Sequence, residues 1–200
     1  MVILSTPEMK QISLKEKIEA LFHKQLELIS DPALRDKVVN VWVNAMKLGG
    51  WAVNDLENIP FTLLVDTQGV SLIDHTIAVT ESAYSMAIAM REIYERAGFK
   101  LNLDWLVAGA LLHDVGKLLE LEQSGTSYRK SYRGKCLRHP MWGAVLAAQE
   151  RLPDEVCNII AYHSREGEGN PIRIETILIR HADFACFDPF ALRAKRMLVE

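Results

Sequence analysis

Cysteine is scarce in this sequence, and the few cysteines form no framework. The three present, Cys136, Cys157 and Cys186, are an odd number without the paired spacing of a zinc site. Free thiols in a reducing compartment are therefore expected. The sequence also lacks an apolar run of the roughly 18 residues needed to span a bilayer. Residues 1–8 lack the basic start and long apolar core of a signal peptide. Together these absences predict a soluble, cytoplasmic protein without a membrane partner.

No single sign of charge dominates either. The formal net charge is −3 over 200 residues, which gives no general reason to expect nucleic acid or an anionic membrane as a partner. Hydrophobic residues make up 49% and charged residues 24% of the chain, so the composition is that of a globular domain with a substantial core. The sequence has no internal repeat and no strand alternation long enough for a large sheet.

Helical periodicity with start and stop signals accounts for most of the chain. A capping box at Ser13 starts the first expected helix, which reaches about Ser30, and Asp31-Pro32 starts the second. Expected helices begin near residues 14, 32, 71, 103, 139, 153 and 173, and a short terminal helix begins at Asp188-Pro189. Residues 51–69 are an irregular connector, with an extended stretch at 61–65 and a turn at 66–69. The sequence therefore predicts an all-α fold.

Histidine and aspartate recur about once per expected helix. An apolar run over 105–112 ends in the adjacent pair His113 and Asp114, and His75 lies 38 residues before His113. Three more residues follow at intervals of 20 to 25 positions: His139, His163 and Asp183. Imidazole and carboxylate are ligands that a divalent transition metal accepts without thiols, so the spacing favours a metal site in a helical bundle. A helix cap or a satisfied core histidine is the alternative at each position taken singly.

Two other histidines are not expected to be metal ligands. His23 lies among polar neighbours in the first helix, which predicts a surface or structural role. His181 is two residues from Asp183, about 200° around a helix, so the two side chains should not reach the same ion. His181 is therefore expected to support the site from outside the ligand set or to be structural.

The segment 120–138 is expected to be a polar loop rich in cations. It carries five basic residues in ten positions: Arg129, Lys130, Arg133, Lys135 and Arg138. Because the loop lies between Asp114 and His139, one interpretation is a phosphate-binding lid in which Arg129, Arg133 and Arg138 contact the substrate. A solvated connector is the alternative, and the sequence leaves both open.

The ordered set of metal-type residues resembles the HD-domain superfamily of metal-dependent phosphohydrolases. The match consists of His75, the pair His113 and Asp114 within a His-Asp-x-Gly-Lys motif, and Asp183. The resemblance covers roughly residues 71–187 and implies a compact helical bundle. It leaves a helical extension at 1–70 and a C-terminal helix at 188–200. His139 and His163 resemble the two additional histidines of the superfamily's binuclear branches.

The resemblance implies one or two divalent metal ions, with Fe, Mn, Zn, Ni and Mg as candidates. One ion would be held by His75, His113, Asp114 and Asp183. The second would be held by His139 and His163, with Asp114 as a bridging carboxylate. This chain has no Gly-rich phosphate loop, so the metals would be the main phosphate anchor. A Gly-Tyr-Pro signature of the cyclic-dinucleotide phosphodiesterases is also missing, which disfavours that activity.

Catalytic roles are expected for Asp114 and Lys117. Two ions about 3.5–4 Å apart can clamp a phosphoryl group and lower the pKa of a bound water toward about 7. Lys117 could steady a phosphate oxygen or pair with Glu120, and the sequence leaves these two interpretations open.

The leading hypothesis is a hydrolase of a small phosphomonoester or phosphodiester, with a nucleotide as one candidate substrate. Mixed-valent di-iron oxygenases of the same superfamily have the same ligand order, so an oxygenase is the first alternative. A non-catalytic signalling module is the second alternative, and the unassigned residues 1–70 keep it open. Binding to nucleic acid is not expected, whereas the formation of a homo-oligomer is left open.

Overall fold

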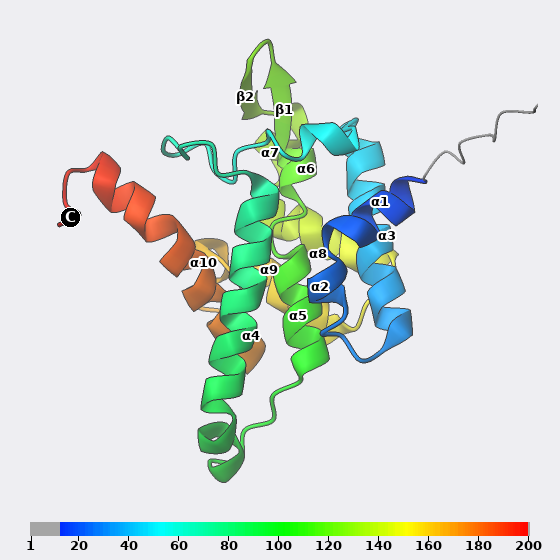
Figure 1. Ribbon diagram of the computed structural model, residues 1–200, viewed down its shortest axis with the longest axis vertical. Helices are drawn as coiled ribbons and strands as arrows, with labels where there is room; N and C mark the ends of the chain where they lie inside the picture. The colour runs from blue at the N-terminus through cyan, green and yellow to red at the C-terminus, as the bar shows by residue number, and fades with distance from the viewer. Residues whose placement is uncertain (1–12, 200) are drawn as a thin grey trace, which may run out of the picture.

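Helices form most of the chain in the computed structural model, which describes residues 13–199 (Figure 1). In chain order the elements are α1 (Leu14–Leu21), α2 (His23–Leu26), α3 (Pro32–Gly49), η1 (Val53–Asp55), α4 (Leu72–Arg96), α5 (Leu103–Leu112), α6 (Lys117–Glu120), β1 (Leu121–Ser124), β2 (Ser127–Lys130), α7 (Tyr132–Cys136), α8 (His139–Gln149), α9 (Asp154–Tyr162), η2 (Arg165–Gly167) and α10 (Ile174–Ala194). The predicted all-α class is confirmed. The expectation about a signal peptide at 1–8 lies outside the described residues.

Side-chain caps begin the helices where the sequence predicts them. Ser71 and Asp74 form a capping box at the start of α4, and the Asn102 side chain accepts a hydrogen bond from the backbone N–H of Trp105 (3.1 Å). Gly50 ends α3 with a φ of 76°, a left-handed conformation that favours glycine. The first expected helix is interrupted at Phe22, whose backbone leaves the helical region, so α1 and α2 are separate.

Helix α5 lies at the centre of the molecule and is buried on all sides. Residues 106–112 are all buried, and α5 packs against α3, α4, α9 and α10. On one side, the Trp42 indole N–H of α3 donates to the carbonyl of Leu111 (3.0 Å). On another side, a side chain at Gly109 would collide with Ile159 of α9, so the two helices approach closely. The polar residues that follow α5 therefore lie in the middle of the bundle.

The prediction that residues 120–138 form a polar loop is wrong. Residues 121–130 form an antiparallel hairpin, β1 and β2, which stands out from the bundle, and α7 follows it (Figure 1). Gly125 supplies the positive φ of 63° at the hairpin turn. Tyr128 rests against Trp51, with ring centroids 6.2 Å apart, and Ser131 caps α7 by accepting from the Gly134 N–H (2.9 Å). The two strands are short and mostly exposed, so their sequences do not alternate between apolar and polar residues. This explains why the sequence did not predict them.

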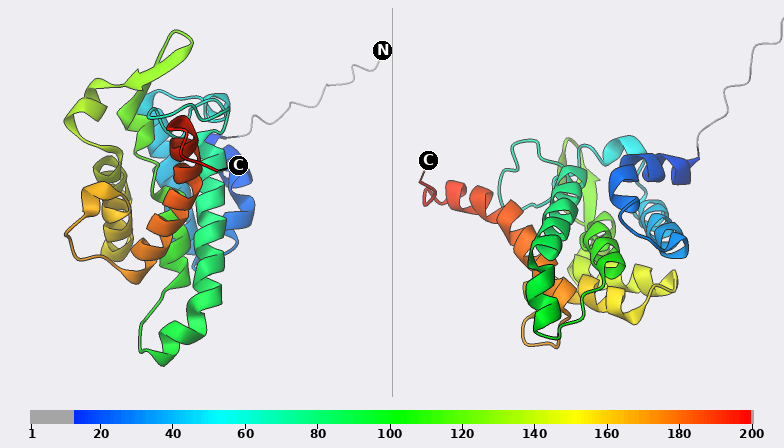
Figure 2. Two further views of the ribbon diagram at one scale, coloured as in Figure 1. Left: turned by 90° about the vertical axis from the view of Figure 1, so that its left-hand side faces the viewer. Right: turned by 60° about the horizontal axis from the view of Figure 1, so that its bottom comes forward.

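The separate terminal helix expected from Asp188 is also not present. Helix α10 continues through Pro189 to Ala194, although a proline inside a helix removes one backbone hydrogen bond. Aromatic contacts on both sides of the proline explain the continuity, because Phe187 and Phe190 each pack edge-on against Phe61, at centroid distances of 6.5 and 5.5 Å. The last turns of α10 project from the bundle (Figures 1 and 2).

The connector before α4 is irregular, as predicted, but the extended stretch at 61–65 is not a strand. The turn at 66–69 is confirmed, with φ values of 52° at Gln68 and 83° at Gly69. Residues of α1 and α3 belong to the same buried cluster as residues of α5 and α8. The division at residues 70 and 187 stays a prediction. None of the helices in 13–199 has the length and apolar character to cross a membrane.

Replacing Pro189 with Ala should raise the free energy of unfolding by about 1–3 kcal/mol, because it restores a backbone N–H within a continuous helix. Pro32 is the matched control, since it is exposed and lies in the first turn of α3, where a proline costs no hydrogen bond. Chemical denaturation of both variants measures the difference. A Pro189→Ala variant that gains no more than Pro32→Ala would contradict a continuous α10.

Candidate metal centre

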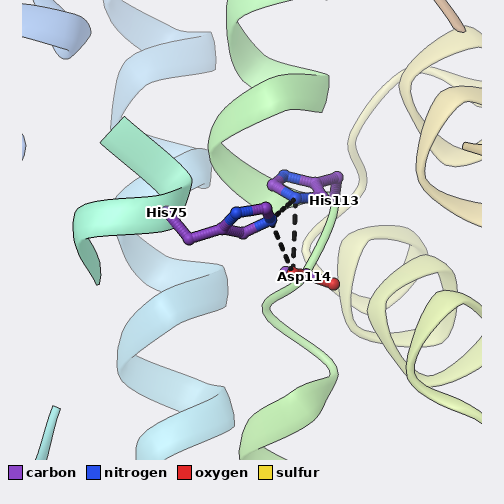
Figure 3. A group of neighbouring side chains, drawn as sticks. All are labelled: His75, His113 and Asp114. Atoms are coloured by element: carbon purple, nitrogen blue, oxygen red, sulfur yellow. Dashed lines mark hydrogen bonds and ion pairs between the residues drawn. The ribbon is translucent and has the colours of Figure 1, made fainter. Parts of the chain in front are cut away.

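The end of α5 brings three buried donor atoms together (Figure 3). His113 is the residue that ends α5, Asp114 follows it, and His75 projects from the first turn of α4. The Nε2 atoms of the two histidines are 3.3 Å apart, and they lie 3.3 and 3.4 Å from Asp114 Oδ2. Asp183 of α10 approaches the same point, with its Oδ1 3.2 Å from His75 Nε2.

A second group of donors shares Asp114 through its other oxygen. His139 begins α8 and places its Nε2 3.2 Å from Asp114 Oδ1. His163 ends α9, and its Nε2 lies 3.9 Å from the same oxygen. Asp114 therefore faces one pair of histidines with Oδ2 and another pair with Oδ1, as a bridging carboxylate would. The structure thus brings five of the six predicted ligand residues into two groups that share Asp114, and Asp183 joins them through its contact with His75.

The separation of the donor atoms fits a metal ion. Two ligands about 2.1 Å from one ion lie about 3.0 Å apart at octahedral angles and about 3.4 Å apart at tetrahedral angles. The 3.2–3.4 Å separations around Asp114 Oδ2 lie in that range. The donor set is nitrogen and oxygen without thiolate, which suits divalent first-row metals.

Backbone carbonyls fix the orientation of two of the histidine rings. The last carbonyls of a helix have no partner within the helix, and here imidazole rings bind them. His113 Nδ1 lies 2.6 Å from the carbonyl oxygen of Ala110, and His163 Nδ1 lies 2.8 Å from that of Ile160. When Nδ1–H donates to the carbonyl, the lone pair on Nε2 points to the centre of the site.

Glu120 performs the same task for His139, and the sequence does not reveal it. Its Oε2 accepts hydrogen bonds from both the backbone N–H (2.6 Å) and Nδ1 (2.8 Å) of His139. Its Oε1 lies 3.0 Å from Arg138 Nε. Burial alone would raise the pKa of Glu120, but His139 and Arg138 lower it to about 2, so the residue is a carboxylate. A four-residue helix with the sequence Lys-Leu-Leu-Glu gives no sequence signal for a buried acid.

Lys117 pairs with Asp114, so of the two interpretations left open by the sequence, the pair with Glu120 is not the one the structure shows. Lys117 Nζ lies 2.5 Å from Asp114 Oδ2 and also donates to the backbone carbonyl of Phe61. The ring of Phe61 in turn stacks on His75, with centroids 4.7 Å apart. Lys117 therefore links the connector before α4 to the carboxylate of Asp114 through two direct contacts.

Charges in the site strongly shift its pKa values. Burial acts to raise the pKa of Asp114, but Lys117 and the neighbouring histidines hold it well below its usual range. Burial acts to lower the pKa of His75, but hydrogen bonds to Asp114 and Asp183 raise it to about 10. Burial and the nearby charge of His113 lower the pKa of His163 to about 3. The carboxylates thus attract positive charge, which a proton or a metal ion can supply.

A cavity of about 510 Å³ opens onto the site. Asp114, His139 and Asp183 line it, together with several cations: Lys117, Lys130, Arg138, Arg165 and Lys195. Arg165 and Lys195 were not expected at the site, and Lys130 was noted only within the basic segment.

Only one of the three predicted loop arginines, Arg138, lies at the cavity. Arg129 pairs with Glu122 on the exposed hairpin (2.8 Å) and is not among the residues that line the cavity. Arg133 is also absent from the lining; it lies over the Trp142 ring and donates to the carbonyl of Leu48 (3.3 Å). Outside the site, His23 is exposed and 3.5 Å from Glu27, as predicted, and His181 is exposed, which does not suit a supporting role.

Comparison with known proteins identifies the fold. The model of the HD domain family matches residues 72–184, more than half of the chain. The chain belongs to the HD domain family. The predicted resemblance is thus confirmed, and the match spans all six clustered residues from His75 to Asp183, including the HD pair itself. No solved structure matches the chain significantly.

Two kinds of curated relative match this HD-domain chain. The dihydroneopterin 2',3'-cyclic phosphate phosphodiesterase of Methanocaldococcus jannaschii is 31% identical over 169 residues, which cover 81% of this chain and 66% of the relative. Ribonuclease Y of Pseudothermotoga lettingae is 32% identical over 115 residues, which cover 58% of this chain and 18% of the relative. Ribonuclease Y of Thermotoga maritima is 30% identical over 100 residues, which cover 50% of this chain and 17% of the relative. The chain thus spans just under two thirds of the phosphodiesterase and less than a fifth of the ribonucleases.

Replacing Glu120 with Gln should weaken metal binding by about 10- to 100-fold, because the amide removes the negative charge that holds His139 in place. Glu122→Gln is the matched control, since Glu122 is two residues away but pairs with Arg129 on the hairpin. Metal titration by calorimetry measures both variants. Equal affinities in the two variants would show that Glu120 does not support the site.

Proposed function

We propose that this protein is a metal-dependent phosphohydrolase that cleaves a small phosphodiester, with a cyclic phosphate as the leading candidate. One observation carries the proposal: two His/Asp groups share the carboxylate of Asp114 beside a cation-lined cavity. The names of the matched relatives support it, since one is a cyclic phosphate phosphodiesterase and the others are ribonucleases. All of them are named for cleavage at phosphodiesters. No comparable observation favours the oxygenase or the non-catalytic module.

The ligand assignment follows the two oxygens of Asp114. His75, His113 and Asp183 would hold one ion with Oδ2, and His139 and His163 would hold a second with Oδ1. Iron, manganese, zinc, nickel and magnesium all remain candidates. When bound, two such ions supply electrophilic contacts for phosphate oxygens and acidify a water molecule.

The side chains around this centre would position the substrate. Lys117 is partly exposed to the cavity while it contacts Asp114, so it can reach a phosphate oxygen beside the metals. Arg138 and Lys130 lie on the same side, and both are held near Glu120, at 3.0 and 3.7 Å from its Oε1. Arg138 also lies 3.3 Å from Glu166, so its guanidinium is fixed at the cavity. These cations replace Arg129 and Arg133 as the proposed substrate contacts.

A small substrate is favoured over RNA. The cavity volume lies within the range of small-molecule sites, about 300–1,000 Å³. The ribonuclease matches cover less than a fifth of those proteins, so they carry little information on how RNA is bound. The absence of a nucleic-acid partner stays a prediction, and a homo-oligomer remains untested.

Asp114→Asn should abolish phosphodiester cleavage and lower the metal content, because an amide lacks the charge needed to bridge two cations. His23→Ala is the control and should change neither quantity, because His23 is exposed on α2. Elemental analysis and the hydrolysis of bis(p-nitrophenyl) phosphate and a nucleoside 2',3'-cyclic phosphate provide the measurements. Cleavage should proceed under nitrogen. A requirement for dioxygen, or loss of activity in both variants, would count against the proposal.

Metal binding should become tighter as the pH rises. The pKa of His75 is raised to about 10 without metal, so this imidazole is protonated at neutral pH and must lose its proton to become a ligand. One released proton corresponds to about a tenfold gain in apparent affinity per pH unit between about pH 7 and 9. Manganese titrations at several pH values measure this slope. An affinity independent of pH in this window would show that His75 is not protonated in the metal-free site.

A further inference from the structure

The four imidazole rings of the metal centre are not all supported in the same way. The torsion that turns an imidazole about its bond to Cβ is only weakly restricted, so a ligand histidine needs support from outside. His113, His139 and His163 each receive it at Nδ1, which lies 2.6–2.8 Å from a carbonyl or carboxylate oxygen. His75 differs from these three, because its support comes mainly from an aromatic ring.

The position of His75 in α4 explains the difference. His113 and His163 each bind the backbone carbonyl three residues earlier, at the end of a helix where such carbonyls have no helical partner. His75 lies in the first turn of α4, and the carbonyl three residues earlier belongs to Leu72. That carbonyl already accepts a hydrogen bond from the hydroxyl of Thr76 (2.8 Å). The device that orients the other two rings is therefore not repeated at His75.

The phenyl ring of Phe61 covers one face of His75 instead. The two ring centroids are 4.7 Å apart and the ring planes differ by 16°, so the rings are stacked. Phe61 is 2% exposed, which makes the contact a dry one. A ring on the face of an imidazole restricts its rotation and leaves the nitrogens at its edge free for a metal. The thiol of Cys186 is a further hydrogen-bond partner of His75, but thiols bond weakly.

Phe61 is itself fixed by contacts with several parts of the chain. Two residues before it, the carbonyl of Ile59 accepts a hydrogen bond from the backbone N–H of Leu72 at the start of α4 (2.7 Å). The carbonyl of Phe61 accepts from the ammonium group of Lys117. Its ring packs edge-on against Phe190 of α10, with centroids 5.5 Å apart. These contacts hold the phenyl ring in place against His75.

We infer that Phe61 is a positioning residue of the metal centre, which holds the imidazole of His75 in the orientation that its ion requires. The inference rests on the ligand assignment of the proposed function and extends the site beyond the family match, which begins at residue 72. Only the ion assigned to His75 and Asp183 should depend on Phe61. The ion assigned to His139 and His163 should not, because the ring of Phe61 stacks on His75.

Calorimetric titration with manganese tests this role without catalysis. Phe61→Leu retains an apolar side chain and the backbone carbonyl but removes the ring face. One of the two ions should then bind about tenfold more weakly, as expected when a group that orients a ligand is lost, and the other should bind as in the wild type. Phe61→Tyr keeps the ring and should bind both ions with wild-type affinity.

Two matched variants separate positioning from general effects. Phe22 is 1% exposed and packs against Trp42, with centroids 5.0 Å apart, so Phe22→Leu makes the same change elsewhere in the core. It should lower the unfolding temperature but leave both manganese affinities unchanged. Phe190→Leu removes the closer of the two contacts between Phe61 and α10, which carries Asp183, and leaves the stack on His75. It should also retain both affinities.

Several results would overturn the inference: unchanged affinities in Phe61→Leu, equal weakening of both ions, or a Phe61→Tyr variant as weak as Phe61→Leu. An equal loss in Phe190→Leu or in Phe22→Leu would do the same. Cleavage of phosphodiesters is measured separately on the wild type. If Phe61→Leu weakens one ion selectively but the wild type cleaves no phosphodiester, the proposed function is refuted and the positioning role of Phe61 stands.

Discussion

The buried carboxylate of Asp114 is the constraint on which the site depends. A carboxylate removed from water must be compensated by nearby positive charge or by hydrogen-bond donors. Histidines from four helices or helix ends and the ammonium group of Lys117 surround it. Because these groups come from α4, α5, α6, α8 and α9, the bundle must bring all of these elements together to neutralise one charge. The sequence that forms the buried site around Asp114 therefore also requires this arrangement of the helices.

Gly116 allows the turn after Asp114 to pack closely against α8. A side chain at Gly116 would collide with the carbonyl of His139, at the start of α8. The turn after Asp114 can therefore approach α8 closely only if residue 116 has no Cβ. Burial of α5 and the close packing at Gly116 determine where the two halves of the site meet.

Much of the fold and the clustering of the candidate ligands could be predicted from the sequence because the signals were local. Caps such as Ser71 and Asn102 act on neighbouring backbone groups, and imidazole and carboxylate at regular helical intervals are rare in apolar segments. Local signals did not predict the features that depend on contacts between residues distant in sequence. Phe61 supports α10 across Pro189, Trp51 supports the hairpin through Tyr128, and Glu120 is identified only by its contact with His139.

The continuity of α10 couples two properties of the site that could otherwise vary independently. One rigid helix carries Asp183 and, two turns later, Ala191 on the same face. An inserted or deleted residue between these two positions would rotate everything beyond it by about 100° and turn Ala191 away from the cavity. During evolution, the part of the cavity lining that α10 supplies can therefore change only by side-chain replacement at constant helix length. The connector at 61–65 is subject to no such helical register, so length changes during evolution are more readily accommodated on that side of the cavity.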